Sequence, residues 1–83
     1  MNEKRLKVND ALLSEKIQVE RKLFFFDLKE NPRGRFLKIT EDVGGRRDTI
    51  IIPSTGLEDF RDALNRTIEA DKAAGPPDIP AEE

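Results

Sequence analysis

Cysteine and histidine are both absent from this 83-residue sequence, and so are tryptophan and tyrosine. Without cysteine the chain can form neither a disulfide nor a thiolate metal site. Without histidine it also lacks the commonest general base and another common zinc ligand. We therefore expect no metal and no other cofactor, so that stability comes from packing or from association.

Long apolar runs are also missing. No stretch approaches the roughly eighteen consecutive apolar residues that a membrane-spanning helix requires. The first ten residues, MNEKRLKVND, contain no apolar core of the kind found in secretion signals. The sequence predicts a soluble, cytoplasmic protein that does not bind membranes.

The sequence offers no recognisable catalytic group. Glu41 and Asp42 are adjacent, so a strand would project them to opposite faces, and no nucleophile accompanies them. The glycines of VGGRRD, residues 43–48, are explained by a hairpin turn, because no helix follows them directly to bind a phosphate. We expect no enzymatic activity and no small-molecule substrate.

Length and composition allow one small domain. With 83 residues, of which 36% are hydrophobic, the chain can form a single core. Residues 1–13 are predicted to form a polar N-terminal segment and residues 14–72 the domain. Residues 73–83, AAGPPDIPAEE, hold three of the five prolines and three acidic side chains, which is typical of a disordered tail.

Four segments show the alternation of apolar and polar residues that predicts strands. They are KIQVER (residues 16–21), KLFFFDLK (22–29), RFLKITE (35–41) and DTIIIP (48–53). Pro32 and Gly34 predict a turn between the second and third strands, and the Gly44–Gly45 pair predicts another before the fourth. Alternation places Phe24, Phe26 and Leu28 on one face, together with Leu37, Ile39, Ile50 and Ile52.

A helix is predicted over residues 57–72. Thr55 and Glu58 match a capping box that would begin it, and Phe60, Leu64 and Ile68 recur at helical spacing. The short connections favour an antiparallel meander with the helix covering one face of the sheet. The expected fold class is α+β, in the order β-β-β-β-α.

One helix is too narrow to cover four strands. The sheet would be about 15 to 20 Å across at roughly 4.8 Å per strand, whereas a helix is about 10 Å wide. A homodimer completed through Phe60, Leu64 and Ile68 would cover the remainder. Alternatively, Ala11, Leu12 and Leu13 could fold over the gap in a monomer.

The other face of the sheet combines aromatic and cationic side chains. Pairing Leu28 with Leu37 places Asp27 opposite Lys38 and Lys29 opposite Phe36. The candidate site residues on this face and at its rim are Lys22, Phe25, Lys29, Asn31, Arg33, Phe36 and Lys38. Taken singly, such residues are ordinary packing and solvation. Together, they form an arrangement that can stack bases and neutralise phosphates.

Charge is unevenly distributed along the sequence. Residues 20–47 contain eight lysines or arginines against five acidic residues, whereas residues 57–72 contain three against five. A basic binding face is therefore compatible with a formal net charge of −2.

The stretch FFFDLKENPRGRFLKI, residues 24–39, and the helical segment DFRDAL, residues 59–64, resemble a single repeat of the Pur-alpha family. The resemblance extends over residues 14–70 and includes the order of strands and helix. This chain is similar to bacterial members with one repeat, which pair two chains.

This resemblance implies binding of purine-rich single-stranded DNA or RNA and a helix exchanged or crossed between two repeats. Lys29 and Arg33 would contact phosphate or a guanine edge, Asn31 would read a base edge, and Phe36 would stack on a base. A Gln-Ser-Lys set of some members corresponds here to Glu20, Arg21 and Lys22, so only the lysine is retained.

The same sheet face is also compatible with a second function. An open sheet face carrying Leu23, Phe25 and Ile51 could instead bind a peptide or another protein. Binding through phosphates must weaken steeply as salt rises, which distinguishes nucleic acid from a protein partner.

Overall fold

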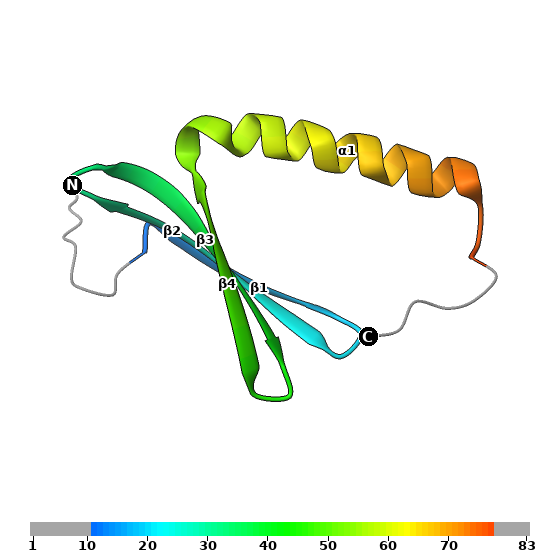
Figure 1. Cartoon of the computed structure of the whole chain (residues 1–83), viewed down its shortest axis with the longest axis horizontal. Helices are drawn as coiled ribbons and strands as arrows, with labels where there is room; N and C mark the ends of the chain where they lie inside the picture. Colours follow the sequence, from blue (N-terminus) through cyan, green and yellow to red (C-terminus); the bar gives the residue numbers. More distant parts are fainter. Residues whose placement is uncertain (1–10, 78–83) are drawn as a thin grey trace.

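The structure is a computed structural model, and it describes residues 11–77. Four strands are followed by a 3₁₀ turn and one helix (Figure 1). In chain order they are β1 (Leu13–Val19), β2 (Lys22–Asn31), β3 (Gly34–Val43), β4 (Arg46–Pro53), η1 (Ser54–Gly56) and α1 (Leu57–Ala74). The predicted α+β fold class and element order are confirmed.

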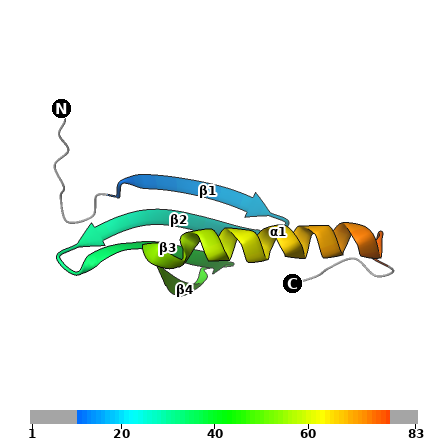
Figure 2. The same cartoon turned by 90° about the horizontal axis from the view of Figure 1, so that it is seen from above.

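The strands form one antiparallel sheet in the order β1-β2-β3-β4 (Figure 2). Leu28 pairs with Leu37, Asp27 with Lys38, and Lys29 with Phe36. These pairs confirm the predicted register. The register matters because a shift by one residue would move every apolar side chain of β2 to the opposite face.

Tight two-residue turns connect the outer strand pairs. Gly44 and Gly45 have φ values of 58° and 89° between the paired residues Val43 and Arg46, which confirms the predicted glycine turn. In the β1–β2 turn Glu20 has a φ of 56°, a left-handed conformation that is unfavourable for a residue with a Cβ atom. The sheet thus accepts local strain at Glu20 to keep this turn short.

Register divides the side chains between two faces of different chemistry. We call the first the apolar face; it carries Leu13, Ile17, Val19, Phe24, Phe26, Leu28, Leu37, Ile39, Ile50 and Ile52. We call the second the basic face; it carries Lys16, Phe25, Lys29, Phe36, Lys38, Arg47 and Ile51 among others. Each face is continuous across the four strands because paired residues project to the same side.

The helix begins where the sequence predicted but by a different route. Residues 54–56 form η1, and Gly56 precedes α1 with no side-chain cap. The predicted capping box of Thr55 and Glu58 is wrong, because Thr55 lies within the 3₁₀ turn. The helix continues to Ala74, two residues beyond its predicted end, and Gly75 follows with a φ of 78°.

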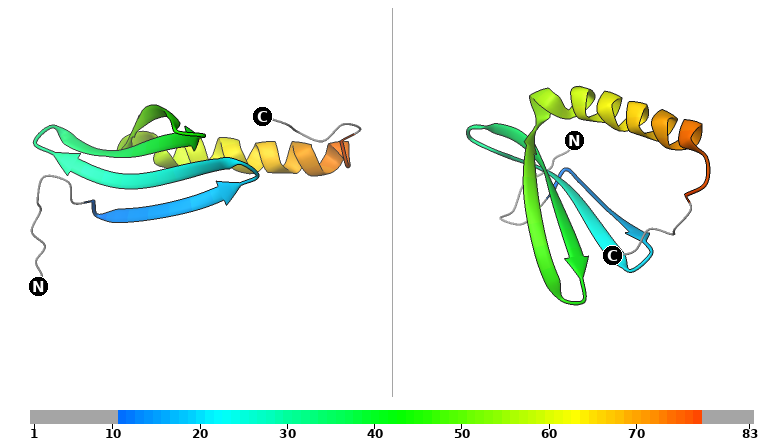
Figure 3. Two further views of the ribbon diagram at one scale, coloured as in Figure 1. Left: turned by 90° about the horizontal axis from the view of Figure 1, so that it is seen from below. Right: turned by 45° about the vertical axis from the view of Figure 1, so that its right-hand side comes forward.

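The expectation that α1 covers the sheet within one chain is also wrong. The helix projects from the end of β4 and lies on neither face (Figures 1 and 3), and its contacts are mainly with η1.

Among the described residues only Ile52 and Thr40 are buried. Phe60, Leu64 and Ile68 remain 46%, 54% and 41% exposed. The alternative, in which Ala11, Leu12 and Leu13 fold over the sheet, is not observed either. The Leu12 amide donates to the Leu28 carbonyl at 2.7 Å and so extends the β1–β2 pairing.

The chain is extended for its size. Its Cα radius of gyration is 15.9 Å, whereas a compact domain of this length has a radius of about 11 to 12 Å. The predicted polar segment and acidic tail fall largely on residues 1–10 and 78–83, outside the described residues. Within residues 11–77, no helix is long and apolar enough to cross a membrane.

Candidate nucleic-acid interface

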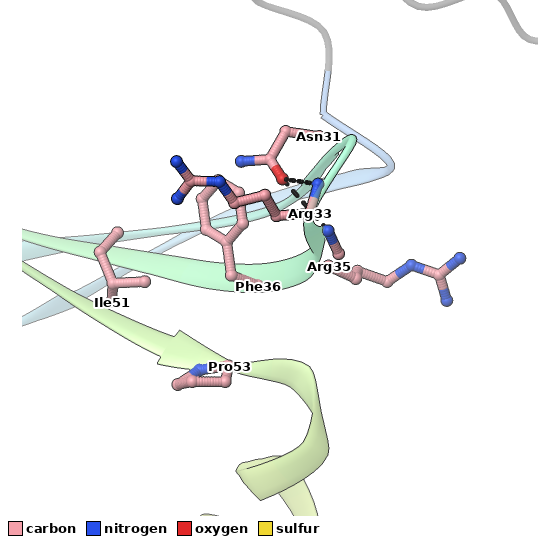
Figure 4. Close-up of a pocket in the computed structure, with 7 residues that line it drawn as sticks. Asn31, Arg33, Arg35, Phe36, Ile51 and Pro53 are labelled. Carbon is pink, nitrogen blue, oxygen red and sulfur yellow. Dashed lines mark hydrogen bonds between the residues drawn. The ribbon is translucent and has the colours of Figure 1, made fainter.

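The β2–β3 hairpin is closed by the side chain of Asn31. Its Oδ1 atom accepts hydrogen bonds from the backbone N–H groups of Arg33, at 2.8 Å, and Gly34, at 3.2 Å (Figure 4). This local bonding is an Asx turn, and it explains why asparagine suits this position. Because both partners donate, the acceptor end of the amide faces the turn and the NH₂ group is the end that can meet a ligand.

Beside this turn, Phe36 forms part of a shallow hollow open to solvent. The hollow has a volume of about 330 Å³ and is also lined by Asn31, Arg33, Gly34, Arg35, Ile51 and Pro53. In Figure 4 the Arg35 side chain extends away from Phe36, and it pairs with Glu30 at 3.0 Å. The volume is at the lower end of the range for ligand pockets, so the hollow suits a small flat group better than a large ligand.

Lysines continue the basic face along the neighbouring strands. Lys29 is paired with Phe36, and Lys38 lies between Asp27 on β2 and Ile51 on β4. The Asp27 carboxylate accepts a hydrogen bond from the Ser14 hydroxyl at 2.7 Å. The strand positions of this face hold four cations, Lys16, Lys29, Lys38 and Arg47, against two carboxylates, Asp27 and Asp42. The face is therefore positively charged although the whole chain is acidic.

Lys22 does not belong to this face, and its predicted placement beside Phe25 is wrong. It shares the parity of Phe24 and Phe26, so the alternation of β2 directs it to the apolar face. Its Nζ atom lies 2.8 Å from a carboxylate oxygen of Glu41, which occupies the same face.

Arg47 is a residue of the basic face that sequence reasoning missed. Its guanidinium carbon lies 5.5 Å from the centre of the Phe25 ring, a cation–π contact that passes over β3. Its Nε atom donates to Asp42 Oδ2 at 2.9 Å, and Asp42 Oδ1 accepts from the Gly45 amide at 3.2 Å. The pairing of Asp42 with Arg47 across the Gly44–Gly45 turn could have indicated this contact.

No group of three acidic side chains within residues 11–77 is close enough to hold a metal ion. A sheet face that carries aromatic and basic side chains is the arrangement with which sheet-based modules bind unpaired nucleotides.

The sequence matches the family described as PurA ssDNA and RNA-binding protein over residues 1–82. It is 52% identical over 61 residues to Transcription factor Pur-alpha 1 of Arabidopsis thaliana, covering 74% of this chain and 21% of that protein. It is 40% identical over 87 residues to human Transcriptional regulator protein Pur-beta, covering 81% of this chain and 28% of that protein. It is 35% identical over 74 residues to human Purine-rich element-binding protein gamma, covering 74% of this chain and 21% of that protein.

The chain belongs to the PurA family of ssDNA- and RNA-binding proteins. The predicted relationship to the Pur-alpha family is thereby confirmed, and the chain has the size of a single repeat. It spans between 21% and 28% of the length of these relatives.

Proposed function

We propose that this protein binds purine-rich single-stranded DNA or RNA through the basic face and the β2–β3 hairpin. The observation that carries the proposal is the separation of the two faces. Phe25 and Phe36 share a face with Lys29 and Lys38, and the Asn31 turn lies at its rim. Family membership and the name of the gamma relative, which refers to purine-rich elements, support the same conclusion.

Within this interface the residues divide by chemistry. Phe36 stacks on an unpaired base in the hollow it forms with Ile51 and Pro53. Lys29 and Arg33 neutralise phosphates beside it, and the Asn31 NH₂ group donates to a base edge. The proposal is one of binding alone and includes no catalytic step and no cofactor.

The opposite, apolar face is proposed to be the interface with a second copy of the chain. Ile17 is 46% exposed and Ile50 is 54% exposed on this face, while the stripe Phe60, Leu64 and Ile68 is exposed on α1. A groove lined by Phe24, Ile39 and Ile50, with Glu41 and Asp48 at its polar side, could receive apolar side chains of the helix. In a two-fold dimer each chain's helix would cover the other's sheet, leaving both basic faces accessible.

A titration tests the proposed function. Purine-rich single strands, pyrimidine-rich single strands and duplex DNA are added separately to the full chain at two salt concentrations. We expect the tightest binding to the purine-rich single strand and a steep loss of affinity at the higher salt. Absence of salt-sensitive binding to every strand would overturn the proposal.

One observation favours a second function, that of a protein-interaction module. Ile51 is 53% exposed on the basic face, beside the hollow of Phe36, and an exposed apolar side chain next to an aromatic one also suits a peptide. This function predicts binding that changes little with salt, so the same titration distinguishes it.

A further inference from the structure

The contact between Arg47 and Phe25 lies at a distance from the hollow of Phe36. Phe36 pairs with Lys29, which is four residues from Phe25 along β2. At about 3.4 Å per residue the two aromatic positions are roughly 13 to 14 Å apart along the strands. The row of Asp27, Lys38 and Ile51 separates them. A base that stacks on Phe36 is therefore too far away to contact Arg47 as well.

The guanidinium group of Arg47 is held in a defined place. Its central carbon lies over the Phe25 ring, 5.5 Å from the ring centre, and its Nε atom donates a hydrogen bond to Asp42. Asp42 is in turn restrained by the amide of Gly45, and its side chain is only 17% exposed. Two contacts thus restrain the guanidinium group before any ligand arrives, and a third restrains Asp42, its hydrogen-bond acceptor.

The Arg47 side chain nevertheless remains 62% exposed. Most of this side chain is therefore accessible to a ligand on the basic face. A planar, delocalised cation with one exposed surface stacks well on a nucleobase, and guanidinium planes serve this purpose in recognition of unpaired bases. A lysine ammonium group offers the same charge but no plane.

We propose that Arg47, backed by Phe25, is a second base-stacking position that holds a purine of the same strand whose other base stacks on Phe36. This inference rests on the proposed function and assigns it a residue. A purine offers the guanidinium plane a larger ring system than a pyrimidine does, so this position favours purines. Arg47 binds through its plane rather than as a point charge on a phosphate.

The test replaces Arg47 by lysine, which keeps the charge and removes the plane. Arg46→Lys is the matched control, because Arg46 is adjacent in sequence and lies on the apolar face. We expect Arg47→Lys to weaken binding of a purine-rich single strand about tenfold, within the range for one stacked base. The plot of log affinity against log salt should keep its slope, and Arg46→Lys should bind as the unaltered chain does.

A second variant keeps the proposal testable if Arg47→Lys alters the fold. Phe25→Leu removes the ring but retains an apolar side chain, and it should weaken purine binding similarly. The double variant should lose less than the product of the two single losses, since both act on one stack. Melting temperatures of all variants, measured without nucleic acid, separate a loss of stacking from a loss of folding.

The outcomes distinguish this inference from the function on which it rests. If the unaltered chain binds single strands in a salt-sensitive manner but Arg47→Lys and Phe25→Leu bind equally well, the stacking position is refuted and the function stands. Equal losses for purine-rich and pyrimidine-rich strands would also refute the purine preference. If the unaltered chain binds no strand, both the function and the inference fail.

Discussion

Asn31 has two ends with separate tasks. Its oxygen closes the β2–β3 turn by accepting from the amides of Arg33 and Gly34. Only its NH₂ group is then available to donate to a base edge, for example to the N7 or O6 atom of guanine. Stability of the hairpin and reading of the ligand therefore depend on different atoms of one side chain.

Substitutions at Asn31 should separate these tasks. Asn31→Asp keeps the acceptor, so the melting temperature should stay close to that of the unaltered chain, whereas single-strand binding should fall because a donor is lost and a negative charge is added. Asn31→Ala removes both ends and should cost about 1 kcal/mol of stability as well. Thermal melting and a binding titration of each variant test this, and unchanged melting of Asn31→Ala would show that the turn does not need the side chain.

Stacking and charge should be separable at the hollow. Phe36→Ala should lose about 1 to 3 kcal/mol of single-strand affinity without changing the salt slope. Arg33→Ala should instead flatten the plot of log affinity against log salt by roughly 0.7 for the phosphate contact it loses. Arg35→Ala is the control, because Arg35 pairs with Glu30 and extends away from Phe36. A salt slope that changes equally in Arg33→Ala and Arg35→Ala would contradict this assignment.

Individual strands were predictable because alternation leaves few choices. With Phe24, Phe26 and Leu28 required on one side, pairing of Leu28 with Leu37 follows, and the structure has that register. The same alternation places Lys22 on the apolar face with Phe24 and Phe26. The prediction of Lys22 beside Phe25 was wrong because it did not apply this alternation to Lys22. The Arg47 contact was harder to predict, since it crosses β3 and depends on the rotamer that Asp42 selects.

The position of the helix could not be predicted from its apolar stripe. The spacing of Phe60, Leu64 and Ile68 shows which side of α1 is apolar but not which surface that side packs against. Three residues of 3₁₀ helix, Ser54–Gly56, determine that direction and turn α1 away from its own sheet. The Thr55 capping pattern misled because a capping residue must have an extended backbone, which a 3₁₀ turn does not provide.

The helical stripe should be essential to folding if a second chain covers it. Phe60→Ala should cost roughly 3 to 5 kcal/mol, as expected when a fully buried ring is removed. Arg61→Ala is the control on the same helix, because its ion pair with Asp62 is local and exposed. Chemical denaturation of both variants gives the comparison, and equal stability would show that the ring of Phe60 is not buried in solution.

At the scale of the whole molecule, no element within residues 11–77 covers the exposed apolar face or the exposed helical stripe. We expect light scattering at low micromolar concentration to give the mass of two chains. The melting temperature should rise with protein concentration, since association stabilises only the folded state. A cooperative monomer whose melting is independent of concentration would refute the dimer.

The acidic end of the chain should act on binding from a distance. Ending the chain at Gly75 retains all of α1 and deletes Asp78, Glu82 and Glu83. Removal of three negative charges should strengthen single-strand binding modestly, most clearly at low salt, and leave the melting temperature nearly unchanged. A large fall in melting temperature would show that the deleted residues stabilise the fold.

The simple strand order β1-β2-β3-β4 also has a consequence for the course of folding. Every strand pairs with its neighbour in sequence through a short turn, so little chain entropy is lost in closing each hairpin. These local pairings can form in a single chain soon after it begins to fold. The contacts that exclude water from the apolar face require, in the proposed dimer, an encounter between two chains. The speed of reaching the native state would then depend on how often chains meet, although nearly all of the sheet is assembled within each one.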